Sequence, residues 1–254
     1  MDNTSPKINI QKFIGAFDNL LSKNNYTSAC ELLEATVIEA EAVQDKPALF
    51  TLYNECIGIY RKIGEKDKCY SYCDKALETT EKLKLSESVS GATTFINCAT
   101  AYKAFGEAGK GISYFEKARK IYEENLPEND KRLAGLYNNF ALTLVDLKRF
   151  DEAITFYEEA IGVLKKHATA QPETAISYLN MANAVEARDG LENACEKIDC
   201  LLDKAEEILN VTQSDNDGNY AFICEKCAPT FGYYGRFFYE SELKERTRKI
   251  YERT

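Results

Sequence analysis

The stretch LYNNFALTLVDLKRFDEAITFYEEAI, residues 136–161, contains two apolar runs that are separated by a short polar break around Lys148. In the first run, Tyr137 is followed by apolar residues four and seven positions later, so that all three share one face of a helix. The second run, around Ala153 and Tyr157, has the same spacing. The stretch therefore predicts two amphipathic helices joined by a tight turn.

This pattern recurs along the chain with a period of about 42 residues. Successive aromatic anchors are spaced 40, 42, 42, 41 and 42 residues apart, at Phe13, Tyr53, Phe95, Tyr137, Tyr178 and Tyr220. A fixed period of this size is typical of stacked helical units, each of which buries its apolar face against its neighbours. Because no segment shows the alternation of a half-buried strand, we expect an all-α fold.

Other positions recur in phase with the anchors. The position sixteen residues after each anchor holds a small residue in five units: Ala29, Cys69, Gly111, Ala153 and Ala194. Small side chains let two helices approach closely, so each unit is expected to be an antiparallel helical hairpin. The turn inside each hairpin is expected at Asn24-Asn25, Gly64, Gly106, Lys148 and Asp189-Gly190.

These motifs resemble a tetratricopeptide repeat, most clearly in residues 136–161 and from Tyr60 to Ala76. The long period resembles the kinesin-light-chain-like subclass rather than the form of about 34 residues. The resemblance implies an α-solenoid, a right-handed superhelix of about six antiparallel helical hairpins, spanning residues 9–254 as one domain after a flexible lead, 1–8. Residues 220–254 are expected to form an atypical capping repeat, because Arg236 occupies the small position and the segment 231–235 is expected to disrupt the turn.

The composition indicates a soluble cytoplasmic protein. Apolar residues make up 44% of the 254 and charged residues 29%, and the N-terminus resembles no signal peptide. No apolar stretch approaches the length of about 18 residues that a membrane span needs, so we expect no membrane partner. The formal net charge of −9 argues against nucleic acid as a partner.

Nine cysteines raise the question of a metal site. Six of them fall on packing positions of the repeat, where free cysteine acts as a small hydrophobic residue: Cys56, Cys69, Cys73, Cys98, Cys224 and Cys227. The alternative is a zinc site in which Cys195 and Cys200 complete Cys224 and Cys227, but a pair five residues apart lies on different faces of a helix. We therefore expect no metal and no cofactor.

Two further features suggest catalysis only superficially. The segment from Gly106 to Gly111 lacks both the GK[ST] ending and the preceding strand of a phosphate-binding loop. The only histidine, His167, is expected in a polar loop. Nothing in the sequence indicates an enzyme.

The strongest functional signal is a row of asparagines two residues after the anchors of three consecutive units, at Asn97, Asn139 and Asn180. Asparagine is a mediocre helix former, so its recurrence at one position calls for a compensating interaction. By the resemblance, these amides clamp the backbone of an extended peptide in the concave groove. The alternative is that each amide bonds to the neighbouring helix and fixes the spacing of the repeats.

Flanking residues of the first helices complete the candidate groove. The peptide-binding set further includes Glu55, Arg61, Thr100, Lys103, Leu142 and Asn183, with Glu186 among the other lining residues. An aromatic run at the C-terminus is a second candidate surface, for contact between copies of the chain, at Tyr233, Tyr234, Phe237 and Phe238. These rings are alternatively the core of the last hairpin, although one helix cannot bury them all.

We expect a non-enzymatic scaffold that binds a peptide or an extended protein segment in the concave groove. One alternative is a peptide-sensing regulator, although such sensors usually carry an effector module and about 12 residues before Phe13 leave no room for one. Another is a structural homodimer or larger homo-oligomer that assembles through the C-terminal aromatic residues.

Overall fold

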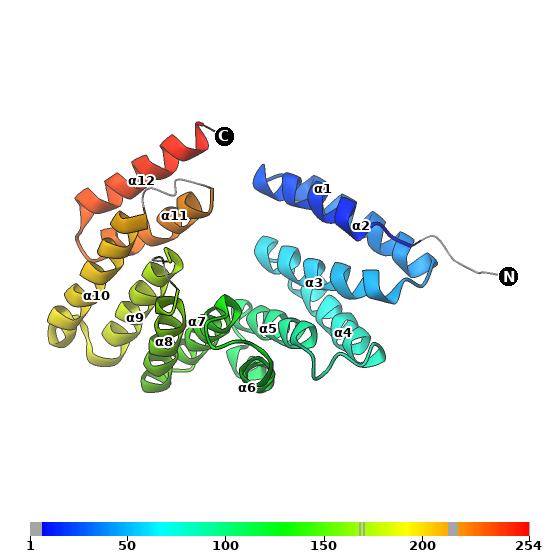
Figure 1. Ribbon diagram of the computed structural model, residues 1–254, viewed down its shortest axis with the longest axis horizontal. Helices are drawn as coiled ribbons and strands as arrows, with labels where there is room; N and C mark the ends of the chain where they lie inside the picture. Colours follow the sequence, from blue (N-terminus) through cyan, green and yellow to red (C-terminus); the bar gives the residue numbers. More distant parts are fainter. Residues whose placement is uncertain (1–6, 168, 170, 213–217, 254) are drawn as a thin grey trace. The chain divides into compact units, whose positions relative to one another are not determined.

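The computed structural model describes residues 7–167, 169, 171–212 and 218–253, and the described residues contain twelve α-helices. Consecutive helices pair as antiparallel hairpins (Figure 1). The chain divides into two compact units at residue 125, and each unit contains six helices. The all-helical prediction is confirmed for the part of the chain described. Most of the N-terminal lead expected over residues 1–8 lies outside it.

The first unit contains three hairpins. Its helices are α1 (Ile10–Ser22), α2 (Tyr26–Ala42), α3 (Lys46–Ile63), α4 (Lys66–Lys82), α5 (Val89–Ala104) and α6 (Ala108–Asn125). Each first helix starts at a polar residue whose side chain accepts a hydrogen bond from a backbone N–H three residues on: Asn9, Asp45 and Ser88. Such caps satisfy amides that the helix itself leaves unpaired.

The second unit has the same organisation. Its helices are α7 (Lys131–Asp146), α8 (Phe150–Lys165), α9 (Glu173–Asp189), α10 (Leu191–Val211), α11 (Gly218–Tyr233) and α12 (Phe237–Tyr251). The first helices of the three hairpins contact one another in order, since α9 touches both α7 and α11. They therefore form one continuous layer.

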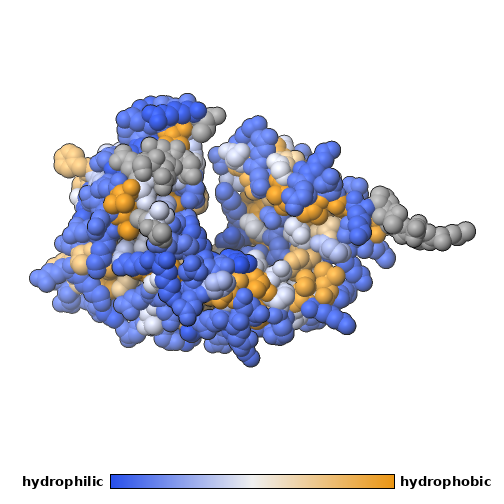
Figure 2. Space-filling model, viewed as in Figure 1, coloured by the Kyte–Doolittle hydropathy of each residue, from blue (hydrophilic) through white to orange (hydrophobic). Residues whose placement is uncertain are grey.

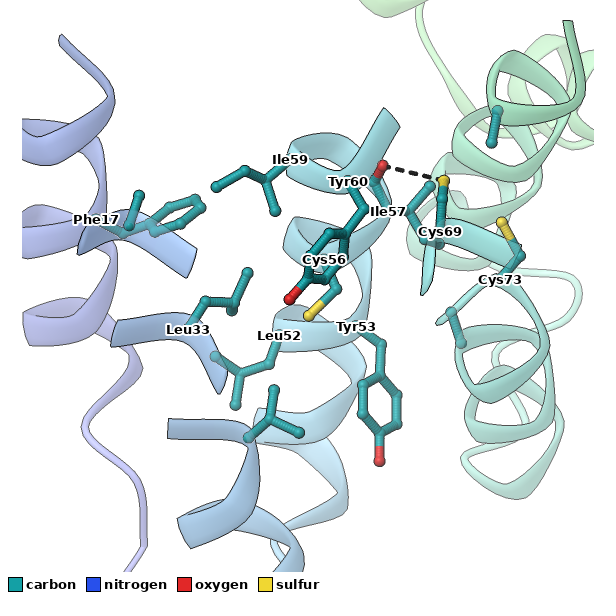
Figure 3. Packing of buried hydrophobic residues seen from close by; sticks show 14 of the residues in the cluster. Phe17, Leu33, Leu52, Tyr53, Cys56, Ile57, Ile59, Tyr60, Cys69 and Cys73 are labelled. Atoms are coloured by element: carbon teal, nitrogen blue, oxygen red, sulfur yellow. Dashed lines mark hydrogen bonds between the residues drawn. The ribbon is translucent and has the colours of Figure 1, made fainter. Parts of the chain in front are cut away.

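The predicted repeat positions form the core. All six aromatic anchors are buried, with between 1% and 7% of their surface exposed. Figure 3 shows this packing in the first unit, where Phe17, Leu33 and Cys56 come from α1, α2 and α3. Burying one such aromatic or aliphatic side chain contributes about 1.5–3 kcal/mol. Outside this core, the visible surface is mostly hydrophilic, with separate hydrophobic patches (Figure 2).

The small position sets how closely the helices of a hairpin pack. Gly111 of α6 faces α5, and a Cβ atom there would lie 2.9 Å from the carbonyl oxygen of Ala99. The predicted turns also occur where expected, because Asn24, Gly64, Gly106, Lys148 and Gly190 all have positive φ. Glycine and asparagine adopt this conformation at low cost.

The last hairpin departs from the predicted disruption. Its turn is intact, but it lies at Gly235, fifteen residues after the anchor Tyr220 instead of eleven or twelve. Helix α11 nevertheless has 16 residues, as many as α5 and α7, so the later turn reflects where Tyr220 lies in its helix and not a longer helix. Arg236 consequently precedes α12 as its N-cap residue, and its guanidinium forms ion pairs with Asp199 and Asp203 of α10 at 3.3 and 2.6 Å.

Candidate functional site

The three asparagines predicted to clamp a peptide have different surroundings. Asn97 of α5 donates a hydrogen bond of 2.9 Å to Oδ1 of Asn54 on α3. Asn139 of α7 donates to the carbonyl oxygen of Gly135, one turn earlier in its own helix, at 3.0 Å. The amide of Asn180 on α9 is half-buried and has no hydrogen-bond partner among the described residues. Within the described structure the amide of Asn180 is therefore unused, whereas one of the two N–H groups of Asn97 is engaged with Asn54.

A second row of asparagines, one residue after the anchors, ties neighbouring repeats together. Asn54 donates to Oγ1 of Thr94 at 3.0 Å, which joins α3 to α5. Asn138 donates to Oγ of Ser177 at 2.8 Å, which joins α7 to α9. In both pairs the hydroxyl comes from the residue just before the next anchor. The sequence already contains this signal, because an asparagine one residue after an anchor is matched by a hydroxyl residue just before the next anchor.

The remaining predicted groove residues of the first unit lie on α3 and α5. Glu55 is half-buried, and its burial together with the nearby charge of Asp18 raises its pKa. Arg61 is exposed in the last turn of α3. Thr100 donates to the carbonyl oxygen of Ile96 at 2.7 Å, and Lys103 is half-buried. Their polar groups thus belong to first helices, as predicted.

In the second unit, α9 and α11 enclose an open cleft of about 390 Å³. We call it the α9–α11 cleft, and it is lined by Asn183, Glu186, Pro229, Thr230 and Tyr233. Leu142 of α7, the other groove residue predicted in this unit, is half-buried. Of the residues predicted from the sequence, the cleft contains Asn183 and Glu186 from the groove and Tyr233 from the aromatic run.

Hydrogen bonds connect these two sets. Tyr233 donates to Oε1 of Glu186 at 2.7 Å, and Tyr234 donates to Oε2 of the same carboxylate at 2.7 Å. The hydroxyl of Tyr234 also lies 3.0 Å from Oδ1 of Asn183. Burial and the bond to Glu186 raise the pKa of Tyr234, and the bond to Glu186 raises the pKa of Tyr233. Both phenols therefore stay protonated and act as donors to the carboxylate.

The other aromatic residues in and beside the C-terminal run divide between core and surface. Phe231 and Tyr239 are buried and pack edge to face, with ring centroids 4.7 Å apart. Phe237 and Phe238 are 64% and 97% exposed. This division agrees with the expectation that one helix cannot bury them all.

The cysteines divide in the same way. All six that were assigned to packing positions are buried, whereas Cys195 and Cys200 are exposed on α10. Burial raises the pKa of Cys224 and Cys227, which keeps both thiols protonated. Within the described ranges, no group of three His, Cys, Asp or Glu side chains is placed to hold a metal ion.

No helix of the described residues has the length and apolar character needed to cross a bilayer.

Comparison with known proteins identifies the repeat. Residues 134–163, which cover most of α7 and α8, match the family model of the tetratricopeptide repeat. No curated protein sequence matches the chain. The remaining similarities are to solved structures.

Three of these structures show the fold relationship. BtubC (BKLC) from P. vanneervenii has a TM-score of 0.67 at 20% identity, over 78% of this chain and 79% of that chain. A putative kinesin light chain with TPR-like repeats from Podospora anserina has a TM-score of 0.55 at 18% identity, over 79% and 94% of the two chains. A Rap protein complexed with competence and sporulation factor has a TM-score of 0.54 at 14% identity, over 95% and 74%.

Proposed function

Since residues 134–163 match the tetratricopeptide repeat and the fold is that of a helical solenoid, we propose that the chain is a non-enzymatic scaffold for protein interaction. It binds an extended peptide or protein segment along the layer of first helices. The observation that carries this proposal is the free amide of Asn180, half-buried on the central helix of the layer α7–α9–α11. An amide supplies both donors and an acceptor, which suits it to the backbone of an extended chain.

Two neighbours of Asn180 support the same surface. Asn139 on α7 uses one amide hydrogen within its own helix and keeps its oxygen for a ligand. Oδ1 of Asn183 lies 3.0 Å from the hydroxyl of Tyr234, and the amino group of Asn183 has no partner within the described part of the chain. Three amides on two adjacent helices thus offer unused hydrogen-bonding groups, and a peptide backbone presents the complementary ones at regular spacing.

A displayed library of random peptides, selected on the purified protein, tests this proposal. We expect enriched peptides whose affinity falls about tenfold or more in the variant Asn139→Ala/Asn180→Ala, because each lost hydrogen bond costs roughly 1 kcal/mol. The control is Asn193→Ala on α10, a second helix, whose amide bonds to the carbonyl oxygen of Asp189. Failure to enrich any peptide, or equal binding by all three proteins, would contradict peptide binding at this layer.

A homo-oligomer is the second candidate, and the exposure of Phe238 at 97% favours it. Exposed aromatic side chains next to one another usually mark a contact surface. Light scattering of the wild type and of Phe237→Ser/Phe238→Ser checks this. A dimer that the double substitution dissociates supports assembly through these rings, and a wild-type monomer rules it out.

The peptide-sensing alternative and a cytoplasmic location stay predictions from the sequence. The Rap protein is complexed with competence and sporulation factor, but at 14% identity its similarity to this chain concerns the fold alone. A sensor would change the conformation of its own chain on binding, so small-angle scattering with and without a selected peptide separates a sensor from a passive scaffold.

A further inference from the structure

We propose that the α9–α11 cleft binds the guanidinium group of an arginine side chain in the partner polypeptide. This inference rests on the proposed function and adds a side-chain specificity to it. Its centre is the carboxylate of Glu186, which lines the cleft next to Asn183 and Tyr233.

The hydrogen bonds of Glu186 leave acceptor positions for a donor group with two parallel N–H bonds. Tyr233 uses one lone pair of Oε1 and Tyr234 uses one of Oε2. Each carboxylate oxygen offers two lone pairs, so one acceptor position remains on each oxygen. Two parallel N–H groups, one for each oxygen, are what a guanidinium presents in its bidentate pairing with carboxylates.

The charge of Glu186 is uncompensated. Within the described residues, no basic side chain pairs with this carboxylate, in contrast to acids elsewhere in the second unit. Arg188, two residues further on, is occupied by Asp151 and Asp189 at 2.7 Å each. Arg236 is occupied by acids of α10. A cationic partner can therefore pair with Glu186 without first displacing a basic residue of the chain itself.

The walls of the cleft suit a planar cation. The ring of Tyr233 is 68% exposed and packs edge to face on the ring of Tyr234, with centroids 4.9 Å apart. An aromatic face next to a carboxylate attracts a guanidinium through its ring electrons as well as through the charge. Pro229 and Thr230, about one turn earlier on the same helix, also line the cleft. The volume of about 390 Å³ lies at the small end of ligand pockets, in keeping with one side chain rather than a large ligand.

Lysine matches this site less well. An ammonium group is a compact charge without a planar fork, so it cannot satisfy both free acceptor positions in one plane. It also stacks less well on the ring of Tyr233. The expected order of affinity is therefore arginine, then lysine, then the uncharged isostere citrulline.

The test uses three small probes on the full chain: N-acetyl-arginine amide, N-acetyl-lysine amide and N-acetyl-citrulline amide. Titrations followed by NMR should shift amide signals of α9 and α11 with the arginine probe, several-fold more weakly with lysine, and not with citrulline. Glu186→Gln keeps the shape and removes the charge, and should weaken the arginine probe about tenfold. Glu158→Gln on α8, an exposed glutamate of a second helix, is the matched control and should leave binding unchanged.

Two results would overturn the inference: arginine-probe shifts that Glu186→Gln does not reduce, or equal binding of arginine and citrulline. If Glu186→Gln alters the circular dichroism spectrum, Tyr233→Ser replaces it, since that exposed ring contributes the stacking face and should weaken arginine several-fold. Peptides that the display selection enriches, but that contain no arginine and bind Glu186→Gln unchanged, would leave the scaffold function standing and reject the arginine site. If no peptide is enriched, the scaffold proposal fails. The titration with the small probes still decides whether the cleft binds a guanidinium group.

Discussion

At the residue scale, the polar groups of the first helices serve two purposes that differ by one position in the repeat. One residue after the anchor, Asn54 and Asn138 tie neighbouring helices through Thr94 and Ser177. Two residues after the anchor, Asn139 and Asn180 keep hydrogen-bonding groups unused within the described structure. Asn97 is the exception, because it joins the first network by donating to Asn54.

The tie between Asn138 and Ser177 is testable by a double-mutant cycle. Asn138→Leu should lower the free energy of unfolding by about 1–3 kcal/mol, because it leaves the buried hydroxyl of Ser177 without its donor. Ser177→Ala should cost less, since Asn138 keeps its bond to the carbonyl oxygen of Ala134. Urea unfolding should show a coupling of at least about 0.5 kcal/mol in the double variant. Strict additivity would show that the two side chains do not stabilise each other.

A single carboxylate also gives a pH prediction. Asp130 caps α7, and its hydrogen bonds with Arg132 lower its pKa to about 2. A lowered folded-state pKa means that the stabilisation is present above the ordinary value of about 3.9 and is lost as the pH falls toward 2. Asp130→Asn retains a capping oxygen and removes the charge. It should cost about 0.5 kcal/mol near pH 6, and the difference should vanish near pH 2. A difference independent of pH would assign the effect to capping geometry.

At the scale of the elements, the hairpins follow from a few residue types at fixed positions. Polar caps start the first helices, residues with positive φ end them, and small residues set the distance to the second helix. These are local rules of backbone geometry and packing, which is why the sequence predicted five of the six turns. The last turn was predicted as disrupted because counting from Tyr220 puts Arg236 at the small position, whereas the turn lies at Gly235, fifteen residues after that anchor.

The small position can be tested inside one helix. Gly111→Ala in α6 should lower the free energy of unfolding by about 1–3 kcal/mol, because the new Cβ meets the backbone of Ala99 and the helices must separate. Gly109→Ala is the matched control, since nothing lies within 4 Å of a Cβ at that position. It should be neutral or slightly stabilising. Equal effects of the two substitutions in chemical denaturation would contradict close packing at Gly111.

At the scale of the whole molecule, the sequence predicts one continuous domain over residues 9–254, whereas the internal contacts separate two compact units at residue 125. Each unit contains three hairpins, which is about the smallest number of repeats that buries a continuous core. We therefore expect residues 1–125 and 126–254, produced as separate fragments, to be helical and to unfold cooperatively. Circular dichroism during thermal unfolding checks this, and a fragment without a transition would favour the single domain.

More of the fold than of the candidate site could be predicted from the sequence. Periodicity gave the buried anchors and the hairpins, and the tetratricopeptide resemblance is confirmed by the family match and the similar structures. The α9–α11 cleft was not foreseen, because it joins Glu186 to Tyr233 and Tyr234, about 47 residues away in the sequence. Sequence spacing shows which residues share a helix face, but it does not show which side chains of two helices meet.

The turn at Gly235 also shows which positions of a first helix the two phenols occupy. Counted back from the turn, the buried positions of α11 match those of α3 counted back from Gly64: Cys224, Cys227, Ala228 and Phe231 correspond to Tyr53, Cys56, Ile57 and Tyr60. Tyr233 and Tyr234 are the last two residues before the turn, where α3 has Lys62 and Ile63. The side chains that hold Glu186 thus stand at ordinary end positions of a first helix. A binding feature of this kind can be gained or lost by substitutions at one helix end, without substitutions in the core of the hairpin.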